Sequence, residues 1–567
     1  MKSKVKKQDQ SYDCDVCIIG AGPAGLACLS ALREPYSMDN LTDEQLNRAN
    51  NSLSLKANKN SNLNIYVLDP SPQWMDTWKT QFDQLQIKHL RSPVLGHPDI
   101  FDNKALLTYA RHHNREDELF ESGCAEMKQL HGLGETQTGL WKLPSTKLFV
   151  DFCDDMTGRL KHVYLQGRAM DVEDSSSGDS SHVLKWEDAS GVMNVLTVKH
   201  IIVASGVMGK ALVPFGLEKC PNVFSWRSNH AFTNLKATQS IDAGTPPESP
   251  RQNIRVLVVG GGLTAVQTAL RVIKEHKDDD IDMQCILCSK RTLKEKHFDI
   301  PVEWFDRRHQ TGLLSGFYHE SVEDRLQQLK DIRDGGSVPK MYMKQLKKYE
   351  KQMTYWMGQV EYDCQNDLAQ EHNEGDDNIK TTIRYQGDYH QFDRIILACG
   401  VTPDCASNPF VSNILKKWKL PIHEGFPDIT EDLQWKESTN STKQNRTPSI
   451  FVSGAMAGLQ VGPDAGNLMG MRRAATTIAS ALDCRSWLRA TTLVNRFEAF
   501  GYSSDEESSS SLDENDEDSN FTGKKSFTTE SITQSEDNCS TCCSCDSERG
   551  DCPVTVPKFV SVQLNGE

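Results

Sequence analysis

The stretch that most constrains the fold is 13–33, which reads DCDVCIIGAGPAGLACLSALR. A short apolar run ends on Gly20, after which Gly20, Gly22 and Gly25 match G-x-G-x-x-G ahead of a helix-forming segment. The first glycine permits a tight turn, the second allows a pyrophosphate to approach the backbone, and the third lets helix and strand pack closely. The phosphates then meet the helix N-terminus. The stretch predicts the strand, turn and helix of a dinucleotide-binding unit.

A second copy of this pattern follows at 255–272, RVLVVGGGLTAVQTALRV. Its residues 260–265 match G-x-G-x-x-A, again between branched strand residues and a helix. The next predicted strand, 283–288, is followed by Ser289 and the cations Lys290 and Arg291. Cations at this strand end suit a 2′-phosphate, so this unit is predicted to prefer NADPH over NADH.

The first unit carries an acid at the matching place. A polar insertion at 34–64 precedes an apolar strand, 65–68, which ends at Asp69. In dinucleotide folds an acid here accepts hydrogen bonds from the adenosine ribose, usually about 20 residues after the glycines. The insertion roughly doubles that gap, and helix capping by Asp69 is the alternative interpretation.

Composition excludes several classes of protein. The net charge is −15 and the pI is near 5.6, whereas a general nucleic-acid binder needs a basic face. No apolar run reaches the length of about 18 residues that a membrane span requires. The first residues are basic and lack the apolar stretch of a signal peptide. Seventeen cysteines without such a signal predict reduced thiols and a cytoplasmic location.

The predicted tail, 501–567, is rich in Ser, acidic residues and Cys. Its segment 503–519 contains eight acidic residues and no basic one, so it is expected to stay disordered. The tail either improves solubility or, in the sharper interpretation, is a phosphorylated regulatory segment. The cysteines between 539 and 552 lack a surrounding core, and no metal site is predicted.

Three further strand ends complete a recurring order of motifs. HIIVASG at 200–206, RIILACG at 394–400 and IFVSG at 450–454 each bring an apolar strand to a small-residue turn. Together with the two glycine motifs, this order resembles the flavoproteins with two dinucleotide-binding domains. The resemblance implies an α/β chain of two Rossmann-like three-layer domains, the second inserted in the first, with FAD in the first and NADPH in the second. The predicted domains are 11–250 and 391–500 for FAD, 251–390 for NADPH, and the tail.

Two C-x-x-C pairs raise the question of a disulfide reductase. Cys14 with Cys17, and Cys285 with Cys288, lie on predicted strands. Residues i and i+3 of a strand have Cα atoms about 10 Å apart and point to opposite faces, beyond the bridging limit of about 7 Å. Both pairs are therefore predicted to be buried apolar side chains.

The segments FDQLQIKHLRSPVLGHPD at 82–99 and GPDAGNLMGMRRAA at 462–475 resemble the lysine/ornithine N-hydroxylase group of class B flavin monooxygenases. Around the first segment, 74–110 is predicted as a long ordered loop closed by a short helix. The resemblance implies that this loop faces the flavin, with Arg91, Ser92 and His97 as catalytic candidates. A hydrogen-bonded structural role is the alternative for His97.

The same resemblance implies a reaction. NADPH reduces the flavin, dioxygen adds to give a flavin hydroperoxide, and one oxygen passes to a nucleophilic nitrogen or sulfur of a small-molecule substrate. Two rival functions stay open: a regulatory flavoprotein that oxygenates nothing, as in the more distantly similar oxidative stress-induced growth inhibitor family, and an NADPH oxidase-type flavoprotein. The sequence does not indicate the oligomeric state.

The helix after the late glycine-rich turn is predicted to begin near Asn467 and to direct its N-terminus at an anionic ring or phosphate. The residues predicted to contact the two cofactors are Gly20, Gly22, Pro23, Ala24, Gly25, Asp69, Trp78, Leu90, Gly260, Gly262, Leu263, Thr264, Ala265, Lys290, Arg291, Gly454, Asp464 and Asn467.

Overall fold

The computed structural model describes residues 12–33, 63–121, 124, 141–174, 181–214, 216–217, 220, 222–232, 253–275, 282–333, 335–362, 380–437 and 448–482. The predicted insertion lies largely outside these residues, and the predicted tail lies wholly outside them. Among the helices described, none has the length and apolar character needed to cross a bilayer.

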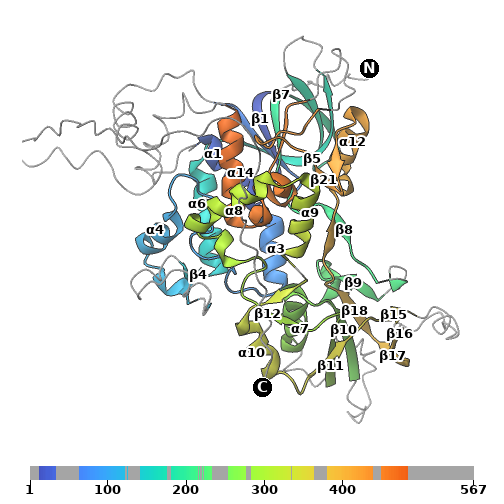
Figure 1. The fold of residues 1–567 in the computed structure, drawn as a ribbon. Helices are drawn as coiled ribbons and strands as arrows, with labels where there is room; N and C mark the ends of the chain where they lie inside the picture. The colour runs from blue at the N-terminus through green and yellow to red at the C-terminus, as the bar shows by residue number, and fades with distance from the viewer. Residues whose placement is uncertain are drawn as a thin grey trace, which may run out of the picture. The chain divides into compact units, whose positions relative to one another are not determined.

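The first sheet includes β1, the strand that precedes the first glycine motif, and α1 follows that motif (Figure 1). Its strands are β1 (Tyr12–Ile19), β2 (Ile65–Asp69), β5 (Val163–Asp174), β6 (His182–Asp188), β7 (Met193–Val203) and β22 (Ile450–Val452). The order β22–β7–β1–β2–β5 is parallel, while β6 bridges β5 and β7 in antiparallel register. The helices α1 (Pro23–Arg33) and α14 (Leu468–Ala481) pack side by side. Because layers cover both faces, the central residues Cys17 and Ile18 are fully buried.

The second sheet is parallel throughout, in the order β14–β11–β10–β18–β9. Its strands are β9 (Val223–Ser225), β10 (Asn253–Val259), β11 (Asp282–Ser289), β14 (Met353–Met357) and β18 (Arg394–Leu397), and α7 (Leu263–Glu275) and α10 (Lys340–Lys348) pack beside one another. In the sequence, the strands of this second sheet come after β7 and before β22 of the first sheet. The predicted class of two Rossmann-like units, one inserted in the other, is therefore confirmed. The second sheet also takes β9 and β18 from the ranges 11–250 and 391–500, which were predicted for the FAD domain.

The remaining helices are α3 (Asp76–Gln84), α4 (Ala105–His112), α6 (Thr146–Arg159), α8 (Arg307–His319), α9 (Val322–Asp331), α12 (Pro409–Trp418) and α13 (Gly458–Val461). Short 3-10 helices are η2 (Glu116–Glu118), η5 (Asn229–Ala231), η6 (Val302–Trp304), η7 (Cys405–Ser407), η8 (Gly454–Ala457) and η9 (Pro463–Gly466). The paired short strands are β3 (Leu119–Phe120) with β4 (Leu143–Pro144), β8 (Gly209–Ala211) with β19 (Val401–Pro403), β12 (Lys294–Glu295) with β13 (Ser337–Val338), and β20 (Ile422–His423) with β21 (Phe426–Pro427). A three-stranded sheet is formed by β15 (Glu361–Tyr362), β16 (Thr381–Tyr385) and β17 (Asp388–Phe392).

The helix α3 corrects the prediction of a continuous loop after Trp74. Its apolar side is narrow, because it rests on Trp78 and Phe82, one helical turn apart. These rings stack with centroids 3.6 Å apart, and Trp78 also lies 5.3 Å from Phe149 of α6. The helix is therefore stabilised by packing on α6, which lies about seventy residues further along the chain. The hydrophobic periodicity of residues 76–84 alone gives no indication of this contact.

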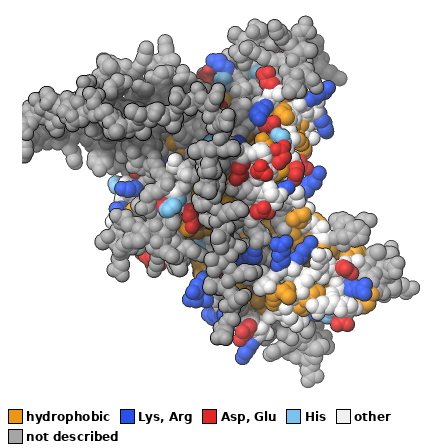
Figure 2. Space-filling model, viewed as in Figure 1, with side chains coloured by type: hydrophobic (Ala, Val, Ile, Leu, Met, Phe, Trp, Pro, Cys, Tyr) orange, Lys and Arg blue, Asp and Glu red, His pale blue; other side chains and the backbone are white. Residues whose placement is uncertain are grey.

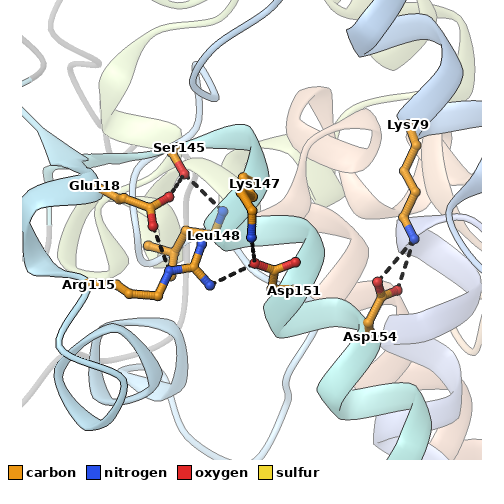
Figure 3. A network of polar contacts seen from close by, with 8 residues as sticks. All are labelled: Lys79, Arg115, Glu118, Ser145, Lys147, Leu148, Asp151 and Asp154. Carbon is orange, nitrogen blue, oxygen red and sulfur yellow. Dashed lines mark hydrogen bonds and ion pairs between the residues drawn. The ribbon is translucent and has the colours of Figure 1, made fainter.

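A polar network fixes the start of α6 (Figure 3). The Ser145 hydroxyl caps the helix by accepting a hydrogen bond of 2.9 Å from the Leu148 N–H, and it donates to the Glu118 carboxylate. Arg115 links Glu118 to Asp151 of α6, with N–O distances of 2.6 and 2.7 Å. The network joins η2 to the start of α6. The predicted flavin-facing loop runs beside the start of α6.

Charged side chains of both signs are interspersed on the face that Figure 2 shows. Over the described residues of that face, Lys and Arg do not form the continuous basic surface that a general nucleic-acid binder needs.

Candidate functional site

The first glycine loop, residues 20–25, follows β1 and lies beside the end of β7. We call this loop the first cradle, because the space at its middle glycine is open. Gly20 has φ +116°, and a Cβ there would lie 2.5 Å from the carbonyl oxygen of Ala204. Gly25 packs so closely that a Cβ would lie 2.0 Å from the Gly20 carbonyl oxygen. A Cβ on Gly22, by contrast, would meet no atom within 4 Å. Gly20 and Gly25 therefore serve packing, whereas Gly22 faces the free space that a pyrophosphate needs.

Asp69 stands at the end of β2, as predicted, and ties this cradle together. Its Oδ2 accepts a hydrogen bond of 2.8 Å from the Ala21 N–H, and its Oδ1 accepts one of 2.8 Å from the Ser71 N–H. The carboxylate thus fixes the glycine loop to the strand end. Because each carboxylate oxygen has a further lone pair, this arrangement is compatible with the predicted ribose contact, which stays a prediction.

The end of β22 lies against the first turn of α1, and Gly466, just before the N-cap of α14, lies beside Ala455, which follows Gly454. A Cβ on Gly454, whose φ is +79°, would lie 3.4 Å from the Cβ of Ala24 in the first turn of α1. Asn467 is the N-cap of α14 and makes no side-chain capping bond. Its amide nitrogen Nδ2 is buried and has no hydrogen-bond partner among the described residues. A buried donor beside a helix N-terminus fits an acceptor oxygen of a bound group.

Asp464 anchors the turn before α14 from within. Its side chain is fully buried and receives both terminal nitrogens of Arg473, one of them at 3.0 Å. The Gln310 amide donates to the same carboxylate at 3.3 Å. Burial raises the pKa of Asp464, and the guanidinium of Arg473 opposes that shift. The side chain stabilises the turn, and its predicted contact with a cofactor stays a prediction.

The loop that carries Arg91 lies along the start of α6. The Leu90 N–H donates to the Pro144 carbonyl at 3.0 Å, and the Thr146 N–H donates to the Lys88 carbonyl at 2.9 Å. The half-buried guanidinium of Arg91 reaches into the second unit.

Arg91 joins this loop to two segments of the second unit. Its Nε donates to the carbonyl oxygen of His297, and its Nη2 donates to the Ser337 hydroxyl at 2.7 Å. Burial lowers the pKa of Arg91, and the charge of Asp299 opposes that shift. Two N–H groups of the Arg91 guanidinium therefore donate to groups within the protein.

Ser92 and His97 occupy different surroundings. A Cβ on Gly96 would lie 3.3 Å from the Ser92 Cβ and 3.5 Å from the Cβ of Leu468, which places this turn against the start of α14. His97 is fully buried, with its Nε2 3.1 Å from the Asn103 carbonyl oxygen and its ring edge-on to Phe152. This placement favours the structural role for His97, and the catalytic role stays a prediction.

A cavity of about 200 Å³ lies beside Arg91. The lining of this cavity is mainly apolar and consists of Phe82, Ile87, His89, Leu90, Arg91, Leu143, Leu263, Gln267, His297, Pro339, Met341 and Tyr342. Of the two predicted cofactor contacts nearby, Leu90 lies in the lining, and Trp78 stacks on the lining residue Phe82. The loop of the first unit and the start of α7 in the second thus share one cavity.

The second glycine loop has the predicted strand, turn and helix. Gly260 has φ +153°, and a Cβ there would lie 2.3 Å from the Ala398 carbonyl oxygen. The next residues, Leu263 and Thr264, begin α7, and Ala265 is buried against the strand. Beyond the end of β11, Lys290 and Arg291 are exposed, as a phosphate-binding role requires.

This second loop differs from the first in being covered. A Cβ on Gly336 would lie 2.2 Å from the Cα of Gly262 and 2.7 Å from its nitrogen. The backbone at Gly336 therefore occupies the space where the corresponding Gly22 is open. The strand, turn and helix are those of a dinucleotide-binding unit, but the backbone of Gly336 lies where a pyrophosphate would approach Gly262. The motif gave no signal of this, because Gly336 lies 74 residues beyond Gly262 in the sequence.

The C-x-x-C pairs lie on β1 and β11, as predicted. Cys14, Cys17, Cys285 and Cys288 are buried free thiols. Burial raises the pKa of Cys17 and Cys285 to about 12, so neither thiol supplies a thiolate near neutral pH. Among the described residues, no group of three or more His, Cys, Asp and Glu side chains is placed to hold a metal ion.

Two sheets with parallel strands around a glycine loop, one inserted in the other, are the fold of flavoproteins with two dinucleotide-binding domains. Solved structures of N-hydroxylating monooxygenases share it. The ornithine N-hydroxylase of Kutzneria sp. 744, solved with reduced FAD, NADP+ and L-ornithine, matches with a TM-score of 0.56 and 12% identity over 84% of this chain and 100% of that one.

Two further structures agree. The ornithine hydroxylase of Pseudomonas aeruginosa has a TM-score of 0.54 and 14% identity, over 83% of this chain and 99% of its own. The FAD-bound cadaverine monooxygenase of Erwinia amylovora, from desferrioxamine biosynthesis, has a TM-score of 0.54 and 13% identity, over 84% and 96%. At such identities the likeness establishes the fold. No family model and no curated protein sequence matches the chain.

Proposed function

We propose that this chain is an FAD-dependent oxidoreductase that uses NADPH and dioxygen to hydroxylate a nucleophilic nitrogen or sulfur of a small molecule. The observation that carries the FAD assignment is the open space at Gly22, which the buried Asn467 Nδ2, without a hydrogen-bond partner among the described residues, supports. The likeness of fold to enzymes of ornithine and cadaverine favours an amine as the substrate.

In this proposal the chain binds and orients the cofactor. Gly22 and the N-terminus of α1 would hold the pyrophosphate, because the helix dipole favours negative charge there. The Asn467 Nδ2 would donate a hydrogen bond to an acceptor oxygen of the bound group. The buried turn Pro463–Gly466 (η9) excludes water on that side. When bound, the flavin supplies the redox and oxygen-activating chemistry.

The catalytic candidates take different parts in this proposal. Ser92, which lies in the turn beside the start of α14, is the residue that we assign to the flavin edge. Arg91 acts as a positioning residue, because its donors are directed at His297 and Ser337. His97 supports the loop from within the core.

Turnover with a panel of amines tests the function. The purified protein is given NADPH with ornithine, lysine, cadaverine and other small amines, and NADPH loss, peroxide and hydroxylamine are measured. The proposal predicts a yellow protein whose NADPH oxidation is slow alone and rises with one class of amine, with hydroxylated product in proportion. Fast release of peroxide independent of any amine would instead identify an oxidase.

A flavoprotein that oxygenates nothing is the second candidate. The observation that favours it is the backbone of Gly336, which lies at contact distance from Gly262, where the pyrophosphate of a nicotinamide dinucleotide would approach the loop. Such a protein would retain FAD, and NADPH would neither bind to it nor bleach its flavin.

A further inference from the structure

The segment Gly335–Val338 crosses the second glycine loop at backbone contact distance. A Cβ on Gly336 would lie 2.2 Å from the Gly262 Cα, 2.6 Å from the Gly261 carbonyl oxygen and 2.7 Å from the Gly262 nitrogen. All three atoms belong to the backbone, so no side-chain movement would relieve the clash. Only glycine permits the approach, and the space it fills is the one where a pyrophosphate meets this loop.

The far end of this segment is firmly held. Ser337 and Val338 form β13, which pairs with Lys294 and Glu295 of β12. Both β13 residues are buried, and the Val338 carbonyl accepts a hydrogen bond of 3.0 Å from the Lys296 N–H. Gly335, at the near end, has φ +84°, and its Cβ position is open. A conformationally free glycine thus precedes the covering residue, and a buried strand follows it.

Arg91 connects the segment to the first unit. Its Nη2 donates to the Ser337 Oγ at 2.7 Å, and its Nε donates to the carbonyl of His297, two residues after β12. The backbone around Arg91 is in turn bound to the start of α6 through Leu90. One guanidinium therefore spans the covering segment, the β12 side and the predicted flavin-facing loop.

We propose that Gly335–Val338 is a strap that closes the second glycine loop, and that the pyrophosphate of a nicotinamide dinucleotide takes the place of Gly336 when it binds. Arg91 is the positioning residue that holds the strap closed through Ser337. This inference rests on the proposed function, since it describes how the same NADPH site is regulated. Displacing the strap disturbs the bond to Arg91, so the loop of the first unit senses the nucleotide.

Two variants weaken the strap by different means. Ser337→Ala removes the acceptor of the Arg91 bond. Gly336→Ala leaves a φ that alanine accepts but adds a Cβ that the closed position cannot hold. Ser449→Ala is the control, because it removes a hydroxyl that bonds His200 at 2.9 Å in the first unit, away from the strap. FAD content is measured in each protein to verify folding of the first unit.

The measurement is the dissociation constant of NADP+ for the FAD-loaded proteins, by calorimetric titration. The strap predicts binding about tenfold tighter in Ser337→Ala than in the wild type, the scale of one hydrogen bond, and unchanged binding in the control. It predicts binding at least as tight in Gly336→Ala, whose Cβ excludes the closed position. Damage to a loop that merely supports the site would weaken binding instead.

Three outcomes overturn the inference. Equal affinity in all four proteins means that the strap does not compete with the nucleotide, while the proposed function stands. Weaker binding in both strap variants means that the segment shapes the site rather than closing it. Absence of NADP+ binding in every FAD-loaded protein overturns the strap and also the NADPH part of the proposed function.

Discussion

At the scale of single residues, two glycines at equivalent positions of their motifs differ in the space beside them. Gly22 faces space free to 4 Å, whereas Gly262 faces the backbone of Gly336. The pattern of glycines predicts both loops, because each needs a tight turn and close helix packing. It carries no information about what lies above the second glycine, which depends on a distant segment.

Gly22→Val tests the open cradle. The added side chain enters free space, so we expect the free energy of unfolding of the apoprotein to change by less than about 1 kcal/mol. The same side chain blocks the pyrophosphate, so FAD should be lost during purification. Gly158→Ala, another glycine with an open Cβ position, is the matched control. Full FAD retention in Gly22→Val would contradict the assignment of this loop.

His162 links stability to pH. Its Nδ1 bonds the Leu160 carbonyl at 2.7 Å, and its Nε2 accepts a hydrogen bond of 2.9 Å from Trp74 Nε1–H, which requires a neutral ring. Burial lowers the pKa of His162, with Arg33 contributing in the same direction. Since the unfolded histidine titrates near 6.5, the unfolded state binds more protons below that pH, and stability is lost as the pH falls.

We therefore expect the free energy of unfolding to fall below pH 6.5, with His162 contributing up to about 1.4 kcal/mol per pH unit. His162→Gln keeps an acceptor for Trp74 but does not titrate. Urea unfolding at pH 7.5, 6.5 and 5.5 should show a shallower slope in this variant by about one proton. An identical slope in variant and wild type would contradict the account.

At the scale of elements, the N-terminus of α14 is the part of the site that sequence located well. The turn and helix were predicted near Asn467, and the helix begins at Leu468. The order strand, glycine-rich turn and helix is local, so periodicity reports it. The helix α3 and the strand β9 were not predicted in their places, because one depends on packing against Phe149 and the other on pairing with β18.

Asn467→Ala separates cofactor binding from capping. The Asn467 side chain makes no capping bond, so we expect the stability of the apoprotein to be unchanged and FAD affinity to fall by about five- to thirtyfold. Asn408→Ala is the control, because the Asn408 side chain does cap α12 at 3.2 Å from the Val411 nitrogen. That variant should lose about 1 kcal/mol of stability and keep FAD. The reverse pattern would contradict the role given to Asn467.

At the scale of the whole molecule, the motif order predicted the architecture. The two glycine motifs and the further strand ends predicted two sheets, but β9 and β18, which both lie in the ranges predicted for the FAD domain, join the second sheet. The contacts of the catalytic candidates were harder to predict than the architecture. Arg91, Ser92 and His97 follow one another in one segment of the chain but contact different parts of the fold. Contacts such as Arg91 with Ser337 join residues 246 positions apart and leave no trace in local sequence.

The burial of cysteines in β1, α1 and β11 gives a prediction for the folded chain. Burial raises the pKa of Cys17, Cys28 and Cys285 to about 12 and that of Cys288 to about 11. Iodoacetamide at pH 8 should therefore leave these thiols unmodified in the native protein and alkylate them in urea, as read by peptide mass spectrometry. Rapid alkylation of the native Cys285 and Cys288 would instead revive a thiol–disulfide function.

Anaerobic mixing of the purified protein with NADPH tests the central claim most directly, because it asks whether one chain holds both cofactors in electronic contact. The account predicts one FAD per chain and bleaching of the flavin absorbance by NADPH, with the colour returning when air is admitted. A folded protein that carries no flavin, or one whose flavin stays oxidised under excess NADPH, would contradict it.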